Sequence, residues 1–63
     1  MSSFLFARDS KTGEKFTINK NKIYYLYHNG RLMFEDPEEK DGILCIYLDE
    51  DDFIEINNKL LNE

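Results

Sequence analysis

Apolar runs separated by polar turns divide most of the chain into short strands. The runs are rich in β-branched and aromatic residues, which is typical of strands. The five predicted strands are 4–8, 14–18, 22–28, 31–35 and 43–48. The last of them is apolar without interruption, which favours a central strand, and the acidic stretch from Asp36 to Gly42 before it predicts an exposed loop.

Glycines mark two of the predicted turns. Gly13 ends the polar cluster after the first strand and is the natural position for a positive φ angle. Asn29-Gly30 lies between two strand patterns, and this dipeptide favours a type I′ turn, in which both central residues have positive φ. We therefore expect a tight hairpin between residues 24–28 and 31–35.

The end of the chain changes to helical periodicity. Asp49 is the expected N-cap, and the three acidic residues after it favour the positive end of the helix dipole. The apolar residues expected on one stripe are Phe53, Ile54, Ile56, Leu60 and Leu61. The predicted fold class is α+β: a small antiparallel β-meander of about five short strands with one C-terminal helix packed on one sheet face, as a single domain over residues 1–63.

The strands carry more apolar surface than one helix can cover. The third strand places Ile23, Tyr25 and Tyr27 on one side and Tyr24 and Leu26 on the other. The first and last strands are also apolar on both sides. Burial stabilises by roughly 1.5–3 kcal/mol for each large apolar side chain. We therefore expect a second subunit to cover the free face, most simply in a symmetric homodimer.

Size and cysteine content limit how the chain is stabilised. With 63 residues it is too short for two domains, and its core is marginal. A single cysteine cannot form an intramolecular disulfide, and one histidine with one cysteine does not make a structural zinc site. Sharing a core with a second copy is the remaining route to stability.

Charge and codon bias suggest a setting. The formal net charge of −5 argues against direct nucleic-acid binding, which needs a cationic face. Residues with AT-rich codons (Phe, Tyr, Met, Ile, Asn, Lys) number 29, against 7 for Gly, Ala, Arg and Pro, which indicates a low-GC bacterium or its phage. The sequence has no signal-peptide pattern and no stretch long enough to span a membrane, so we expect a location in the cytoplasm of the bacterial host.

Residues suited to catalysis are few. His28, the single histidine, precedes a tight turn and has no partner carboxylate at a suitable spacing. Cys45 lies mid-strand among apolar residues, with no basic neighbour to lower its pKa. Carboxylates cluster at 35–41 and at 49–55, and neither cluster matches the calcium-loop pattern. We therefore expect a protein that is not an enzyme and that uses no cofactor and no metal.

Aromatic and basic residues on the strands suggest ligand binding. Tyrosine rings can stack on bases, and arginine or histidine can meet phosphates. The candidate ligand-binding residues are Arg8, Tyr24, Tyr25, Tyr27, His28 and Arg31. Tyrosines are equally common at dimer interfaces. The favoured hypothesis is a non-enzymatic, oligomeric, phage-type antagonist of host defence that sequesters a nucleotide-derived signalling molecule at or near the subunit interface.

Acidic residues support an alternative hypothesis. Clustered carboxylates can bind a basic host protein, in the special case by imitating the charge spacing of nucleic acid. The candidate partner-binding residues are Glu35, Asp36, Glu38, Glu39 and Asp41. In this reading the protein is an inhibitor or regulator of a host protein.

One stretch resembles a known family. Gly13-Glu14-Lys15-Phe16-Thr17-Ile18-Asn19, followed four residues later by Ile23, is similar to the pattern of the small flagellar FlbD family. Those proteins have similar length and also end in a strand and an acidic-led helix, here 43–48 and 52–61. The family's proline after the asparagine is Lys20 in this chain. The resemblance implies a fold of this kind and a flagellar accessory role.

Overall fold

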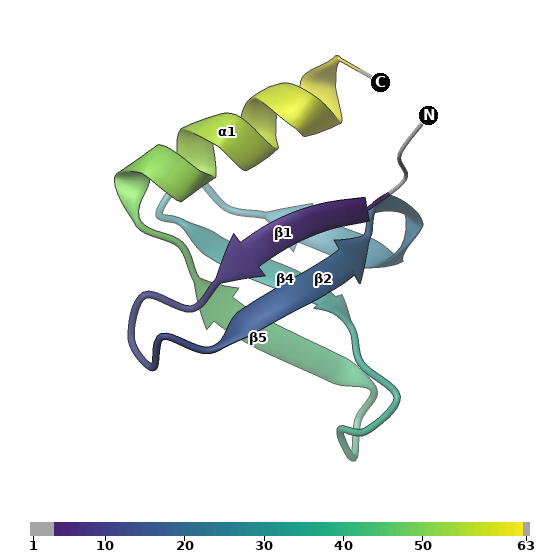
Figure 1. The fold of residues 1–63 in the computed structure, drawn as a ribbon. Helices are drawn as coiled ribbons and strands as arrows, with labels where there is room; N and C mark the ends of the chain where they lie inside the picture. The colour runs from purple at the N-terminus through teal and green to yellow at the C-terminus, as the bar shows by residue number, and fades with distance from the viewer. Residues whose placement is uncertain (1–3, 63) are drawn as a thin grey trace.

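The computed structural model describes residues 4–62 (Figure 1). The elements are β1 (Phe4–Arg8), β2 (Lys15–Asn19), the short 3-10 helix η1 (Lys20–Lys22), β3 (Ile23–Leu26), β4 (Arg31–Glu35), β5 (Ile43–Tyr47) and α1 (Glu50–Leu61). Within this part of the chain, the five strands, the C-terminal helix and the α+β class predicted from the sequence are confirmed. The third strand is shorter than predicted because residues 27–30 form the following turn.

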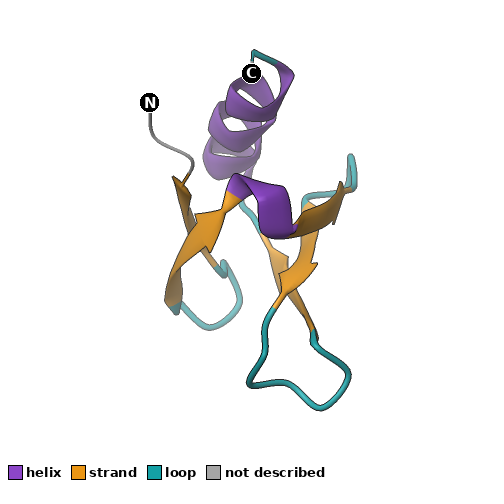
Figure 2. Ribbon diagram, turned by 90° about the vertical axis from the view of Figure 1, so that its right-hand side faces the viewer, coloured by secondary structure: helices purple, strands orange, loops and turns teal. Residues whose placement is uncertain are grey.

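The strands form two antiparallel sheets rather than one. β1 pairs with β2, and a second sheet has the order β3-β4-β5. Figure 2 shows the two sheets side by side, with α1 across one end. The prediction that the apolar run 43–48 is central was wrong: β4 is central, because successive hairpins place β3 and β5 on its two sides, and β5 is an edge strand.

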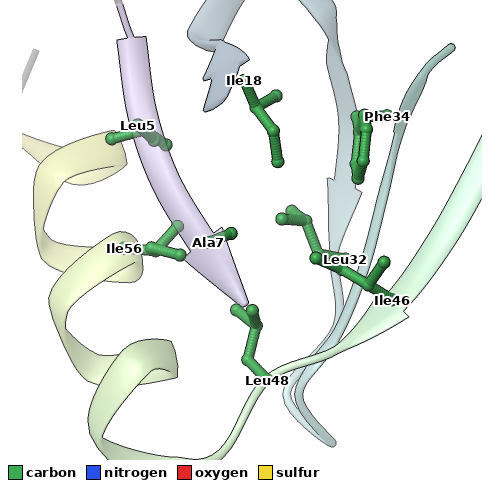
Figure 3. Close-up of a cluster of buried hydrophobic side chains, with 8 residues drawn as sticks. All are labelled: Leu5, Ala7, Ile18, Leu32, Phe34, Ile46, Leu48 and Ile56. Carbon is green, nitrogen blue, oxygen red and sulfur yellow. The ribbon is translucent and has the colours of Figure 1, made fainter. Parts of the chain in front are cut away.

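The core lies between the two sheets and under the helix. Leu5, Leu32 and Ile46 are its most buried large side chains, each at most 1% exposed. Figure 3 shows the eight buried residues, Leu5, Ala7, Ile18, Leu32, Phe34, Ile46, Leu48 and Ile56. Residues 4–62 thus share one apolar cluster. Every strand except β3 contributes at least one buried side chain to it, and α1 contributes Ile56.

The turn between β3 and β4 is not the predicted type I′ turn. Among residues 4–62 only glycines have positive φ, so Asn29 lacks the angle that this turn requires. The Gly30 N–H donates to the Tyr27 carbonyl (3.0 Å) and the Tyr27 N–H donates to the Arg31 carbonyl (2.8 Å). This is a three-residue hairpin loop closed by a glycine bulge, with Gly30 at φ 93°. The predicted hairpin itself is confirmed.

The helix begins as its sequence predicts. The Asp49 carboxylate accepts a hydrogen bond from the Asp52 N–H (3.0 Å), which confirms Asp49 as the N-cap. The apolar stripe is narrower than predicted: Ile56 is buried, whereas Ile54 and Leu61 are exposed by 52% and 73%. At about 100° per residue, Ile54 and Leu61 lie roughly 160° and 140° around the helix from the buried Ile56, so they fall on the side turned away from the core.

Neither helical segment in residues 4–62 has the length and apolar character that crossing a membrane requires.

Candidate functional site on the outer face of the sheet

One side of the β3-β4-β5 sheet is left uncovered by the described chain. Side chains alternate along each strand, so the inward position of Leu32 and Ile46 turns their neighbours outward. We call this side the outer face; it consists of Tyr25, Tyr27, Arg31, Met33, Glu35, Ile43, Cys45 and Tyr47. It carries three of the four tyrosines; the first strand, which the sequence analysis counted with these strands, belongs to the other sheet.

An irregularity in β3 decides which tyrosines reach the outer face. Between Ile23 and Tyr25 the pairing with β4 shifts register. As a result Ile23 packs against the core, while Tyr25 turns outward beside Met33. The sequence-based assignment of Ile23 and Tyr25 to the same side was therefore wrong, because a bulge of this kind breaks the alternation of two.

Arg31 lies at the centre of an aromatic cluster. Its guanidinium carbon is 4.4 Å from the centroid of the Tyr27 ring, and Tyr47 is its cross-strand neighbour on β5. The Tyr25 and Tyr27 ring centroids are 5.9 Å apart. Hydrogen-bonding interaction with the Tyr27 side chain, and then with Tyr47, raises the pKa of Arg31, so the guanidinium stays charged at every physiological pH.

The charge of Arg31 is not neutralised within the described residues. In residues 4–62 no carboxylate lies within salt-bridge distance of its guanidinium, and its buried Nε has no hydrogen-bond acceptor. The buried Nε is out of reach of a ligand, so an incoming anion would meet the terminal nitrogens of this half-buried guanidinium, where charge-assisted bonds are strong. Three of the residues that the sequence analysis proposed for ligand binding, Tyr25, Tyr27 and Arg31, therefore lie together in the structure.

A second cation reaches the outer face from the β1–β2 turn. Lys11 Nζ lies 3.9 Å from the centroid of the Tyr47 ring. The Ser10 N–H donates to the Tyr47 carbonyl (2.7 Å), which holds this turn against β5. Sequence reasoning missed Lys11, because the contact depends on how two distant segments pack and no local pattern indicates it.

The other predicted ligand residues lie away from this cluster. Arg8 forms a salt bridge with Asp49 (3.3 Å) at the start of α1. The His28 ring faces Phe53, with the ring centroids 6.1 Å apart. Tyr24 is at the irregular position of β3 and, among the described residues, makes no ring contact. The structure therefore brings together half of the predicted set and separates the rest.

Surface hollows lie on other sides of the molecule. One of about 570 Å³ lies between the β1–β2 sheet and α1, with Arg8 and Lys15 opposite Asp52 and Glu55. Another, of about 400 Å³, lies beside His28 at the start of α1. The outer face is an open sheet surface, so a ligand there would need a second chain to enclose it.

The acidic loop is more ordered than its composition suggests. The Asp36 carboxylate accepts from the Glu38 N–H (3.0 Å), and the Asp41 carboxylate accepts from the Ile43 N–H (3.1 Å). Glu35 is 3.6 Å from Lys22 Nζ. Of the five predicted partner-binding residues, Glu38 and Glu39 are the two whose side chains have no partner within residues 4–62.

No group of three or more His, Cys, Asp or Glu side chains within residues 4–62 is placed to hold a metal ion. Comparison with known proteins was negative throughout: no family model, no curated protein and no solved structure matches the chain. The geometry of the outer face is therefore the basis on which a function can be inferred.

Proposed function

We propose that the protein is a small, non-enzymatic binding protein whose outer face takes an anionic ligand with a planar ring, a nucleotide or a derivative of one. The observation that carries the proposal is the uncompensated Arg31 guanidinium among the rings of Tyr27 and Tyr47. A carboxylate beside the Arg31 guanidinium would indicate a structural ion pair. Its absence within residues 4–62 leaves the charge available to a phosphate.

The surroundings of Arg31 supply the second half of nucleotide recognition. Tyr25 is 63% exposed, so its ring can stack on a base, while Arg31 and Lys11 would meet the phosphates. No bond needs to be formed or broken. The protein would act by mass action, lowering the free concentration of a nucleotide-derived signal. In a low-GC bacterium or its phage, the source that the amino-acid composition indicates, such a protein would act as an antagonist of host defence.

Self-association belongs to the same proposal. A flat sheet surface encloses little of a ligand, whereas two copies can form a pocket between them. The side chains at the edge of the outer face would gain contacts with the second copy in such a homodimer.

Calorimetric titration with ATP, cyclic AMP and a cyclic dinucleotide tests ligand binding. We expect at least one of these probes to bind the wild-type protein, and we expect Arg31→Ala to weaken that binding about tenfold or more, because a charge-assisted bond is lost. Arg8→Ala is the matched control, since Arg8 is an equally charged residue away from the outer face. Failure of all three probes, or equal loss in both variants, would contradict the proposal.

The same titrations address the acidic alternative. Glu38→Gln combined with Glu39→Gln should leave nucleotide binding unchanged, because the acidic loop is not part of the Arg31 cluster. A host-protein interaction that these substitutions abolish and Arg31→Ala preserves would transfer the function to the loop.

A further inference from the structure

The four sheet edges of this protein are protected very differently. α1 runs along β1, β2 begins with Lys15 and continues into the lysines of η1, and β3 is short and irregular. These are the usual devices that prevent strands from pairing between molecules. β5, with the sequence Ile-Leu-Cys-Ile-Tyr, has no charge, no proline and no bulge. Among residues 4–62 no strand pairs with its other side.

The hydrogen bonds at the two ends of β5 show which backbone groups face this open edge. At one end the Asp36 N–H donates to the Gly42 carbonyl, and at the other the Leu48 N–H donates to the Gly30 carbonyl. Both bonds point toward β4, and backbone groups alternate in direction along a strand. The residues whose N–H and C=O groups point to the open edge are Ile43, Cys45 and Tyr47.

Two of these six groups are already occupied. The Tyr47 carbonyl accepts from the Ser10 N–H (2.7 Å), and the Ile43 N–H donates to the Asp41 carboxylate (3.1 Å). Within residues 4–62, the groups that remain without a partner are the N–H of Tyr47, the C=O of Ile43, and both groups of Cys45. Cys45 is exposed, so the open edge is accessible at its midpoint.

We infer that β5 pairs antiparallel with β5 of a second copy, about a twofold axis that passes beside Cys45. In this register each Cys45 N–H donates to the Cys45 carbonyl of the other copy, and each Tyr47 N–H donates to the Ile43 carbonyl of the other copy. All of the free groups are then used, in four hydrogen bonds. A shift of two residues in either direction leaves only two such bonds, because the remaining donors and acceptors meet the occupied groups.

This inference rests on the self-association in the proposed function and gives it an edge-to-edge geometry, in which the second copy lies beside each Arg31 cluster rather than over it. The two sheets become one sheet of six strands, and the two outer faces become continuous. Met33 and Cys45 of each copy form one apolar stripe across the axis, with Tyr25 at each end. Ile43 of one copy lies beside Tyr47 of the other, so each Arg31 cluster is extended by a residue of the second chain.

Cys45 is the single cysteine of the chain, which makes it a native probe of this axis. A short bismaleimide should link two copies of the wild-type protein through Cys45. The matched control is Cys45→Ser combined with Glu38→Cys. This variant moves the thiol away from the twofold axis, to the exposed loop between β4 and β5. We expect a linked dimer from the wild type and little from the control.

Sedimentation velocity tests the strand pairing without chemical modification. Cys45 is exposed and is not part of the core, so a substitution there should leave the fold intact. Cys45→Lys places two cations opposite each other across the axis and should weaken dimerisation about tenfold or more. Cys45→Ser keeps the edge uncharged and should dimerise like the wild type. Circular dichroism of both variants verifies the fold.

Three results would overturn the inference: a wild-type monomer at high micromolar concentration, a dimer that Cys45→Lys leaves intact, or equal linking in the control. A dimer that survives Cys45→Lys while nucleotide binding still depends on Arg31 would reject the β5 pairing alone. Loss of nucleotide binding in every titration with an intact β5 dimer would reject the ligand and keep the pairing.

Discussion

At the scale of single residues, two backbone positions show how the turns fix the fold. Gly30 has a φ of 93°, and a Cβ built on it would lie 2.8 Å from the Leu48 carbonyl oxygen. Its own carbonyl accepts from the Leu48 N–H (2.8 Å). This glycine therefore both closes the β3–β4 hairpin and lets the end of β5 approach it. Gly13 has a similar φ of 79° but open space around it.

Gly30→Ala should destabilise the protein more than Gly13→Ala. Both substitutions carry the strain of positive φ, of the order of 1–2 kcal/mol. At Gly30 the added methyl group also meets a backbone oxygen, which cannot move away as a flexible side chain could. Urea unfolding of the two variants measures the difference, and equal losses would show that the contact with Leu48 does not matter.

Asp49 should make the stability of the protein depend on pH. The Asp52 N–H is the main cause that lowers the pKa of Asp49, with a smaller contribution from Arg8. A folded-state pKa below the ordinary value means that this stabilisation is present at neutral pH and is lost as the pH falls through the folded pKa. Asp49→Ala should lower the stability at neutral pH, because the first turn of α1 loses its capping carboxylate.

Urea unfolding at neutral pH and at about pH 3 checks this prediction. The difference between the wild type and Asp49→Ala should shrink in acid. Asp49→Asn is the control: its amide oxygen still caps the helix, so it should retain most of the neutral-pH stability without titrating. A difference that does not change with pH would contradict the assigned cause.

At the scale of elements, the sequence predicted each strand, the helix and the β3–β4 hairpin, but not the division into two sheets or the edge position of β5. Alternation and turn residues are local signals, so they located β1 to β5 and the Asp49 cap. Whether β5 is central depends on whether another strand pairs with its second edge, and no local pattern in the sequence shows this. The same limit applies to the site: Tyr27 and Arg31 are close in sequence, whereas Lys11 and Tyr47 come together only through tertiary packing.

The helix offers a matched pair of residues for testing which of its faces the core uses. Ile56 is 2% exposed and Ile54 is 52% exposed, with the same side chain in the same element. Ile56→Val should cost about 0.5–1.5 kcal/mol through a lost buried methylene, and Ile54→Val should change stability by less than about 0.5 kcal/mol. Equal losses in chemical unfolding would indicate that Ile54 is buried in solution, for example against another chain.

At the scale of the whole molecule, apolar side chains remain exposed on several sides. Phe6 on β1, Tyr25 on the outer face and Leu61 on α1 are each more than 60% exposed. Exposed apolar residues alone do not indicate which surface a second copy covers. The backbone is more selective, because hydrogen-bond donors and acceptors must match in position and direction. The free groups of β5 are all used in one register only when two copies pair, and this distinguishes β5 from the other exposed surfaces.

A dimer that forms only from folded chains makes thermal stability depend on protein concentration. Each tenfold increase in concentration should raise the melting temperature of the wild-type protein by roughly 3–6 °C, since association stabilises the folded state by mass action and a chain of this size has a small unfolding entropy. Cys45→Lys should melt at nearly the same temperature across the series, because its open edge no longer pairs. Calorimetry of both proteins over the same concentrations provides the comparison. A parallel rise in the two would place the dimer contact away from β5, and a flat wild-type profile would mean that the folded chain is stable alone.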